Sequence, residues 1–105
     1  MSVKELKWLI EQIEDELDDA EKYAKAAAKF KSDNKSVADT CIELSRQEIK
    51  HSEMLHMCAV EMIEKYKASG KSIPEGMKTV YDFMHERMIE RAAKVKMMLS
   101  QYSIA

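Results

Sequence analysis

Residues that break helices are scarce in this chain. Its 105 residues include only two glycines and one proline, so few positions favour a turn and long helices are expected. Ser2, Ser36 and Ser72 each precede an acid by three positions, as in the capping boxes that start helices. Gly70 is suited to end the second helix. This spacing predicts an all-α chain with helices over residues 3–31, 36–69 and 73–102.

The predicted helices are joined by short polar turns, which makes neighbouring helices antiparallel. The length, with 46% hydrophobic and 34% charged residues, predicts one globular domain over residues 1–105. The net charge of −2 gives no reason to expect a nucleic acid or an anionic membrane as a partner. No apolar run reaches the roughly 20 residues that span a bilayer, and the N-terminal residues do not resemble a signal peptide. We therefore expect a cytoplasmic protein.

One face of the second predicted helix carries an apolar stripe with polar residues in its middle. The inward heptad series is Val37, Cys41, Leu44, Glu48, His51, Leu55, Cys58 and Met62. We expect both cysteines to be buried, reduced thiols, because they lie about 25 Å apart on one helix, too far for a disulfide. A carboxylate buried without a partner costs several kcal/mol. Glu48 therefore needs a counter-charge, a hydrogen-bond donor or a metal ion.

Apolar series on the other two helices define the rest of the expected core. On the first helix the series is Val3, Leu6, Ile10, Ile13, Leu17, Ala20, Ala24 and Ala27. On the third helix it is Met77, Val80, Met84, Met88, Ala92, Val95 and Leu99. These apolar series predict an antiparallel three-helix chain. The first two helices have more apolar surface than the third helix can cover.

Glu16 lies on the shoulder of the first apolar series. In an antiparallel hairpin, residues equally far from the turn lie side by side, so Glu16 comes level with His51 and within one turn of Glu48. Glu48 and His51, three residues apart, share one helix face. Two carboxylates and an imidazole at one depth make half of a two-metal carboxylate site in a helical bundle. Iron and manganese both suit such ligands.

These residues resemble the ligand pattern of the ferritin-like, rubrerythrin-type di-iron carboxylate superfamily. The pattern is Glu16 with Tyr23, then Glu48-Ile-Lys-His51 followed by S-E-M-L, and the resemblance covers residues 10–60. It implies a ferritin-like fold in which Glu16 and His51 are terminal ligands and Glu48 bridges two iron or manganese ions. It also implies a ferroxidase-type oxidoreductase that oxidises Fe(II) with dioxygen.

A third helix alone does not complete such a site. Its residues level with His51 and Glu48 are Ala92 and Val95, which cannot bind a metal. The other half has to come from a second copy of the chain across a two-fold axis, as in the short encapsulated ferritins, which this chain resembles in size. We therefore expect a homodimer or a larger assembly, with two ions at each dimer site.

The same residues also allow a different class of function. Without metal, Glu16, Glu48 and His51 form a polar core in which an ion-paired histidine sets the helix register. The protein is then a non-catalytic helical assembly or adaptor module. Other enzyme classes find no support, because the sequence has no Gly-rich phosphate loop, nucleophile elbow or Cys-x-x-Cys pair.

The other two histidines also follow an acid by three positions. Glu53 is expected to face outward, so that Glu53 and His56 form a surface contact. Asp82 and His85 come level with Cys58 and are either a second polar site or a pair on the helix surface. The first helix is rich in acids and the third in bases, which indicates charge complementarity between helices or between subunits.

Overall fold

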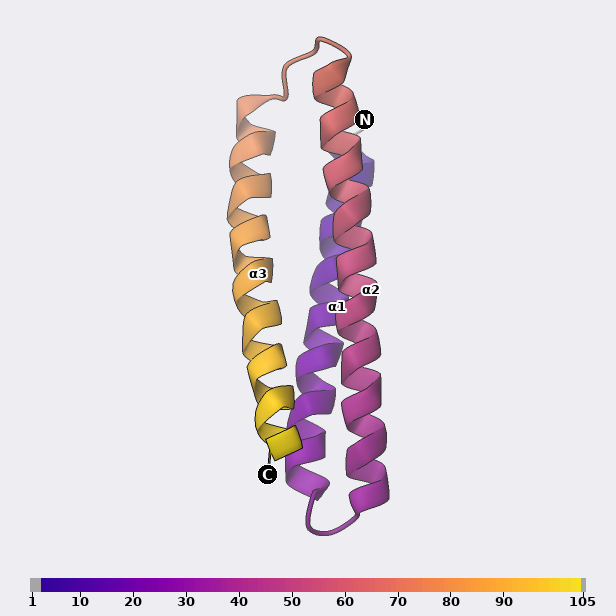
Figure 1. Ribbon diagram of the computed structural model, residues 1–105. Coiled ribbons are helices and arrows are strands. Elements are labelled where there is room, and N and C mark those ends of the chain that lie inside the picture. The colour runs from indigo at the N-terminus through magenta and orange to yellow at the C-terminus, as the bar shows by residue number, and fades with distance from the viewer. Residues whose placement is uncertain (1–2, 105) are drawn as a thin grey trace.

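The computed structural model describes residues 3–104, and this range forms three helices (Figure 1). They are α1 (Val3–Phe30), α2 (Lys35–Ala68) and α3 (Glu75–Ile104). Successive helices run in opposite directions and form a rod of 56 × 18 × 17 Å. The predicted all-α chain is confirmed, and every helix boundary lies within two residues of its expected position. Within residues 3–104, none of the helices is long and apolar enough to cross a membrane.

The cap of α2 differs from the expected one. The side chain of Asn34 accepts a hydrogen bond of 3.2 Å from the backbone N–H of Val37, and Asn34 is therefore the N-cap. Ser36, the predicted cap, lies inside the first turn of the helix. Asparagine and serine are similarly good caps, so the turn geometry, rather than residue preference, makes the choice here.

The turn between α2 and α3 has one predicted feature and one that was not predicted. Gly70 follows the C-cap residue Ser69 and has a φ of +81°, the left-handed conformation that glycine adopts at the end of a helix. The prediction for Gly70 is confirmed. α3 begins at Glu75, so Ser72 lies too early to be its N-cap. The predicted cap at Ser2 lies outside the described residues.

The apolar series predicted for α1 is confirmed for its described side chains. The residues of this series that are buried are Leu6, Ile10, Ile13, Leu17, Ala20, Ala24 and Ala27. The side chain of Val3 is not among those described. The N-terminal part of α1 thus offers large aliphatic side chains to the core, and its C-terminal part offers alanines.

The buried face of α2 lies one residue away from the predicted stripe. The buried residues are Ala38, Ile42, Ser45, Ile49, Ser52 and Ala59. The prediction that Val37, Cys41 and Cys58 are buried was therefore wrong. Val37 is 41% exposed, Cys41 is half-buried and Cys58 is exposed. A shift of one residue rotates a helix face by about 100°. The alanines and serines of the observed face let α2 approach α1 closely, and the leucines and methionine of the predicted stripe would not.

α3 runs along one side of the α1–α2 hairpin and packs mainly on α1 (Figure 1). The members of its predicted series that face the core are Met77, Met84, Met88, Ala92, Val95 and Leu99. Val80 is exposed, so its prediction was wrong. Tyr81 packs against the core at this level instead.

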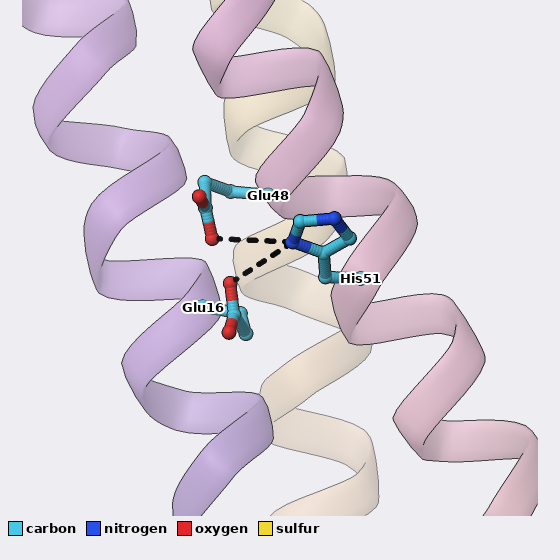
Figure 2. A group of neighbouring side chains, drawn as sticks. All are labelled: Glu16, Glu48 and His51. Carbon is cyan, nitrogen blue, oxygen red and sulfur yellow. Dashed lines mark ion pairs between the residues drawn. The ribbon is translucent and has the colours of Figure 1, made fainter.

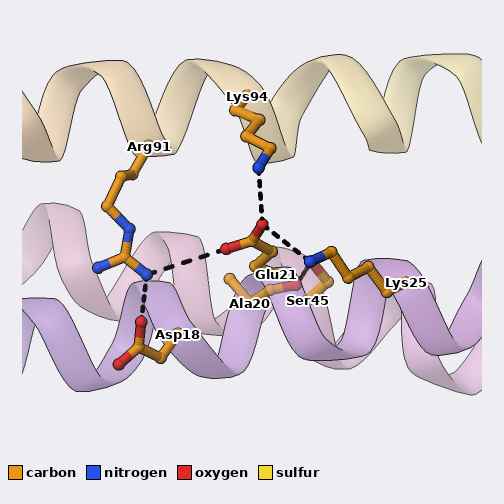
Figure 3. Close-up of polar contacts among 7 residues, drawn as sticks. All are labelled: Asp18, Ala20, Glu21, Lys25, Ser45, Arg91 and Lys94. Atoms are coloured by element: carbon orange, nitrogen blue, oxygen red, sulfur yellow. Dashed lines mark hydrogen bonds and ion pairs between the residues drawn. The ribbon is translucent and has the colours of Figure 1, made fainter.

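Ion pairs tie the C-terminal half of α3 to acids on α1 (Figure 3). Arg91 donates a hydrogen bond to Asp18, and Lys94 Nζ donates one of 3.0 Å to Glu21 Oε1. The hydrogen bonds from Lys94 and Lys25 hold the pKa of Glu21 below its usual value. The complementarity between acids of the first helix and bases of the third is therefore present within one chain.

Candidate metal centre

Three side chains of metal-ligand type meet between α1 and α2 (Figure 2). Glu16 comes from α1, and Glu48 and His51 come from α2. Nδ1 of His51 lies 3.6 Å from Oε2 of Glu16 and 3.8 Å from Oε2 of Glu48. One ligand atom from each residue lies within 4.8 Å of the others. The predicted convergence of these three residues is confirmed.

The tight turn between α1 and α2 explains why these residues meet. The backbone N–H of Asn34 donates to the carbonyl of Phe30 at 2.8 Å, so the chain reverses within a few residues. A short turn holds the two helices in antiparallel register, and Glu16 and His51 lie at similar distances from it. The three-residue spacing then places Glu48 beside His51 on the same face of α2.

The cluster lies at the edge of the hairpin rather than in its core. The side chains of Glu16 and Glu48 are 25% and 19% exposed, and that of His51 is 53% exposed. The prediction that Glu48 and His51 occupy the buried stripe of α2 is therefore wrong. Both carboxylates keep part of their hydration, so burial by itself does not require a metal here.

The donor atoms are of types that bind a divalent metal ion. Nitrogen and oxygen ligands bind such an ion at roughly 2.0–2.2 Å, which places neighbouring ligands roughly 3 to 3.5 Å apart. The separations of 3.6 and 3.8 Å from Nδ1 of His51, and the limit of 4.8 Å that encloses one ligand atom from each residue, exceed this range, so the side chains would have to rotate to bind one ion. Carboxylates with an imidazole suit iron and manganese. The same atoms can form a metal-free ion pair when His51 is protonated.

α3 does not cover this cluster. Val95 packs with Ile42 and Ile49 in the core, and Ala92 packs with the core cluster that contains Ile13 and Leu17. The prediction that Ala92 and Val95 lie beside the ligands is therefore wrong, because both residues face the core instead. In Figure 2 the three ligands lie in front of α1 and α2, and α3 lies behind.

We call the side of the hairpin that carries the cluster the open face. On α1 it includes Trp8, Glu16 and Tyr23, and on α2 it includes Val37, Cys41, Leu44, Glu48, His51, Cys58 and Met62. All these side chains are half-buried or exposed. At one end of the face, Trp8, Cys58 and Met62 help to line a groove of about 510 Å³. The candidate ligands thus lie among apolar residues that this chain leaves partly uncovered.

No family model, curated protein or solved structure matches this chain. The likeness to the ferritin-like superfamily therefore depends on Glu16, Tyr23, Glu48 and His51 and their spacing. Function has to be argued from the chemistry of the site.

A second histidine cluster lies between α2 and α3, where the acid spacing does not predict one. The ring of His56 stacks on that of His85, with 4.6 Å between the ring centroids. Glu53 is exposed, as expected, but pairs with Lys96 at 3.1 Å. The predicted surface contact between Glu53 and His56 is therefore wrong. His85 meets His56 rather than Cys58.

A heptad signal in the sequence could have located His56. Ile42, Ile49 and Ile63 are spaced so that His56 occupies the remaining position of one seven-residue repeat. The first two isoleucines are buried, and Ile63 and His56 are half-buried. A histidine in a series of core isoleucines indicates an imidazole that is taken partly out of water.

Proposed function

We propose that this chain binds iron or manganese at Glu16, Glu48 and His51, and that a second copy of the chain completes the site. The proposal is carried by one observation. Two carboxylates and an imidazole converge within 4.8 Å on a face that α3 leaves uncovered. Three ligands do not fill the coordination of such an ion, so the remaining ligands come from water or from another chain.

The surroundings of the cluster favour another chain over water. Leu44 lies one turn before Glu48 and is half-buried, and Cys41 and Val37 are partly exposed further along the same side of α2. Burial of apolar surface stabilises by about 25 cal/mol per Å². A two-fold axis through the open face would set two identical ligand sets opposite each other. Four carboxylates and two imidazoles are the ligand set of di-metal sites in helical bundles. Glu48 would bridge the ions, and Glu16 and His51 would be terminal ligands.

Metal analysis of protein purified without a polyhistidine tag tests binding. After reconstitution with Fe(II) or Mn(II), we expect about one ion per chain, which corresponds to two per dimer site. The Glu48→Gln and His51→Ala variants should lose the metal because each lacks a ligand. Glu53→Gln is the matched control, since it changes the glutamate of the other Glu-x-x-His pair on α2. An equal metal content in all four proteins, or none in the wild type, contradicts the proposal.

Oxidation of Fe(II) is a separate claim that the resemblance suggests. Formation of Fe(III) in air, followed by absorbance, is expected to be faster with the wild-type protein than with His51→Ala. A protein that binds iron but does not accelerate its oxidation would be a metal-binding protein and not a ferroxidase. Metal binding and catalysis are thus decided by different measurements.

A non-catalytic helical assembly is the second candidate. The contacts of 3.6 and 3.8 Å from Nδ1 of His51 are also those of a protonated histidine between two carboxylates. In this case the reconstituted protein contains no iron or manganese. The Glu48→Gln and His51→Ala variants then remain folded and keep the oligomeric state of the wild type.

A further inference from the structure

Three nearly parallel rings connect α2 with the N-terminal half of α3. The centroids of His56 and His85 are 4.6 Å apart, and their planes differ by 7°. The ring of Tyr81, one turn before His85, lies 5.6 Å from it with planes 8° apart. The ion pairs that α3 makes through Arg91 and Lys94 are in its C-terminal half. The stacked rings lie in the other half, where Met77, Tyr81 and Met84 also pack against the core.

The environment of His56 favours a neutral imidazole. Nε2 of His56 is buried and has no hydrogen-bond partner among the residues that the structure describes. Burial, and secondly the neighbouring His85, hold the pKa of His56 below its ordinary value. Burial also raises the pKa of Tyr81. These effects have one cause, because a charged form is poorly solvated between the two helices.

The cavity that the two histidines line offers little counter-charge to an imidazolium. From α1 it is lined by Ile13 and Leu17, which are apolar. From α2 and α3 it is lined by Glu53 and Lys96, which pair with each other at 3.1 Å. The one acid in this lining is thus already neutralised by a base.

Other acids lie nearer to Tyr81 than to the histidine pair. Asp82 of α3 helps to raise the pKa of Tyr81. Glu11 and Glu14 of α1 line a separate groove together with Tyr81. Neither His56 nor His85 lines this groove, so these acids do not compensate a charge on the stack as a direct ion pair would.

The ring geometry does not suit a metal ion shared by the two histidines. An ion bound to an imidazole lies near the plane of the ring, along the lone pair of a nitrogen. Two rings stacked face to face, with planes 7° apart, cannot both direct a lone pair at one point. The pair is better described as two stacked rings.

We propose that His56, stacked on His85, forms a pH-dependent latch that holds the N-terminal half of α3 on the hairpin while His56 is neutral. Protonation of His56 places a charge in a partly buried position, where the acid that lines the same cavity, Glu53, is already paired with Lys96. When α3 moves away, water solvates both rings. Because Arg91 and Lys94 hold the C-terminal half, the release is confined to residues 75–90.

Acid is expected to favour release. An undocked histidine titrates near its ordinary pKa of about 6.5, whereas His56 in the docked state has a lower pKa. Below about pH 6.5 the undocked state therefore binds more protons than the docked state. The stabilisation of docking is fully present above this pH and is lost as the pH falls toward and through the pKa of the docked state.

Hydrogen exchange of the backbone amides of residues 75–90 tests the latch. Between about pH 7.5 and about pH 5.5, after correction for the intrinsic pH dependence of exchange, we expect protection of this segment to fall about tenfold. Protection of the α1–α2 hairpin should stay constant. The His56→Ile variant completes the isoleucine series of α2 and packs without titrating, so it should lose the response.

Glu86→Gln is the matched control, because it removes an exposed titratable group of the same segment that does not line the cavity of the two histidines, and it should respond like the wild type. Constant protection in the wild type, or a response of equal size in His56→Ile, overturns the proposal. If circular dichroism at neutral pH shows that His56→Ile does not fold, His56→Phe replaces it. That variant keeps a ring stacked on His85 and removes the group that titrates.

Discussion

Side-chain size at single positions determines how closely α1 and α2 approach. The small buried residues of α2, spaced by seven, are Ala38, Ser45, Ser52 and Ala59. Those of α1 are Ala20, Ala24 and Ala27. The resulting proximity lets the hydroxyl of Ser45 donate a hydrogen bond of 2.7 Å to the carbonyl of Ala20. Position 45 is therefore sensitive to volume more than to polarity.

Substitutions of Ser45 separate these two effects. Ser45→Ala loses a hydrogen bond of about 1 kcal/mol, partly offset by the roughly 0.5 kcal/mol better helix propensity of alanine. Ser45→Leu forces a larger side chain between two close backbones and should destabilise by about 1–3 kcal/mol or more. Chemical denaturation measures both free energies of unfolding. A Ser45→Leu protein as stable as Ser45→Ala would mean that the helices are not closely packed at this position.

At the scale of an element, α2 carries two apolar stripes that are one residue apart. One includes Ile42, Ser45 and Ile49, and α1 covers it. The other includes Leu44 and His51 and stays partly exposed. A helix that is apolar on two adjacent sides needs two neighbours to bury both. α3 packs mainly on α1, so within the described residues the second stripe of α2 lacks a second neighbour along much of its length.

The start of α2 can be tested with two neighbouring residues. Asn34→Ala removes the side chain that caps the N–H of Val37 and should destabilise the protein by about 1 kcal/mol. Ser36→Ala is the control, because Ser36 lies inside the first turn and alanine is a better helix former there. Thermal unfolding of both variants measures the difference. A larger loss for Ser36→Ala would restore Ser36 as the cap.

At the scale of the whole molecule, the two sides of the hairpin are unequal. α3 covers one side, and the open face with its three candidate ligands is the other (Figures 1 and 2). A chain of this size has a small core and gains stability when it buries more apolar surface. Specific interfaces take about 800 Å² from each partner, and a face along two helices of about 30 residues is long enough to supply it.

A charge on the open face should prevent the proposed dimer. Leu44→Lys introduces an ammonium one turn before Glu48, and we expect a folded monomer that also binds less metal. Phe83→Lys is the matched control, because Phe83 is 62% exposed on α3, away from the open face. Light scattering coupled to gel filtration measures the mass. A Leu44→Lys protein with the mass of the wild-type dimer, or a dimer lost equally in Phe83→Lys, argues against the open face as the interface.

The sequence by itself determined the features that depend on local spacing. Scarce glycine and proline predict the long helices, and these are confirmed, as is Gly70 after the end of α2. Equal distances from a short turn predict that Glu16 and His51 meet, and they do. The first two inferences need only the backbone preferences of glycine and proline. The third needs only the rise and periodicity of a helix, which are the same in every protein.

Only the tertiary structure decided the rotation of α2 about its axis. Two stripes of α2 have the same heptad periodicity, and this pattern alone does not show which of them packs on α1. Packing chose the stripe of Ile42 and Ser45, because its small side chains fit the alanines of α1. This choice left Glu48 and His51 at an edge and brought His56 toward α3. The physical reason is that the rotation of α2 depends on how its side-chain volumes fit those of α1. The spacing of residues within one helix carries no information about this fit.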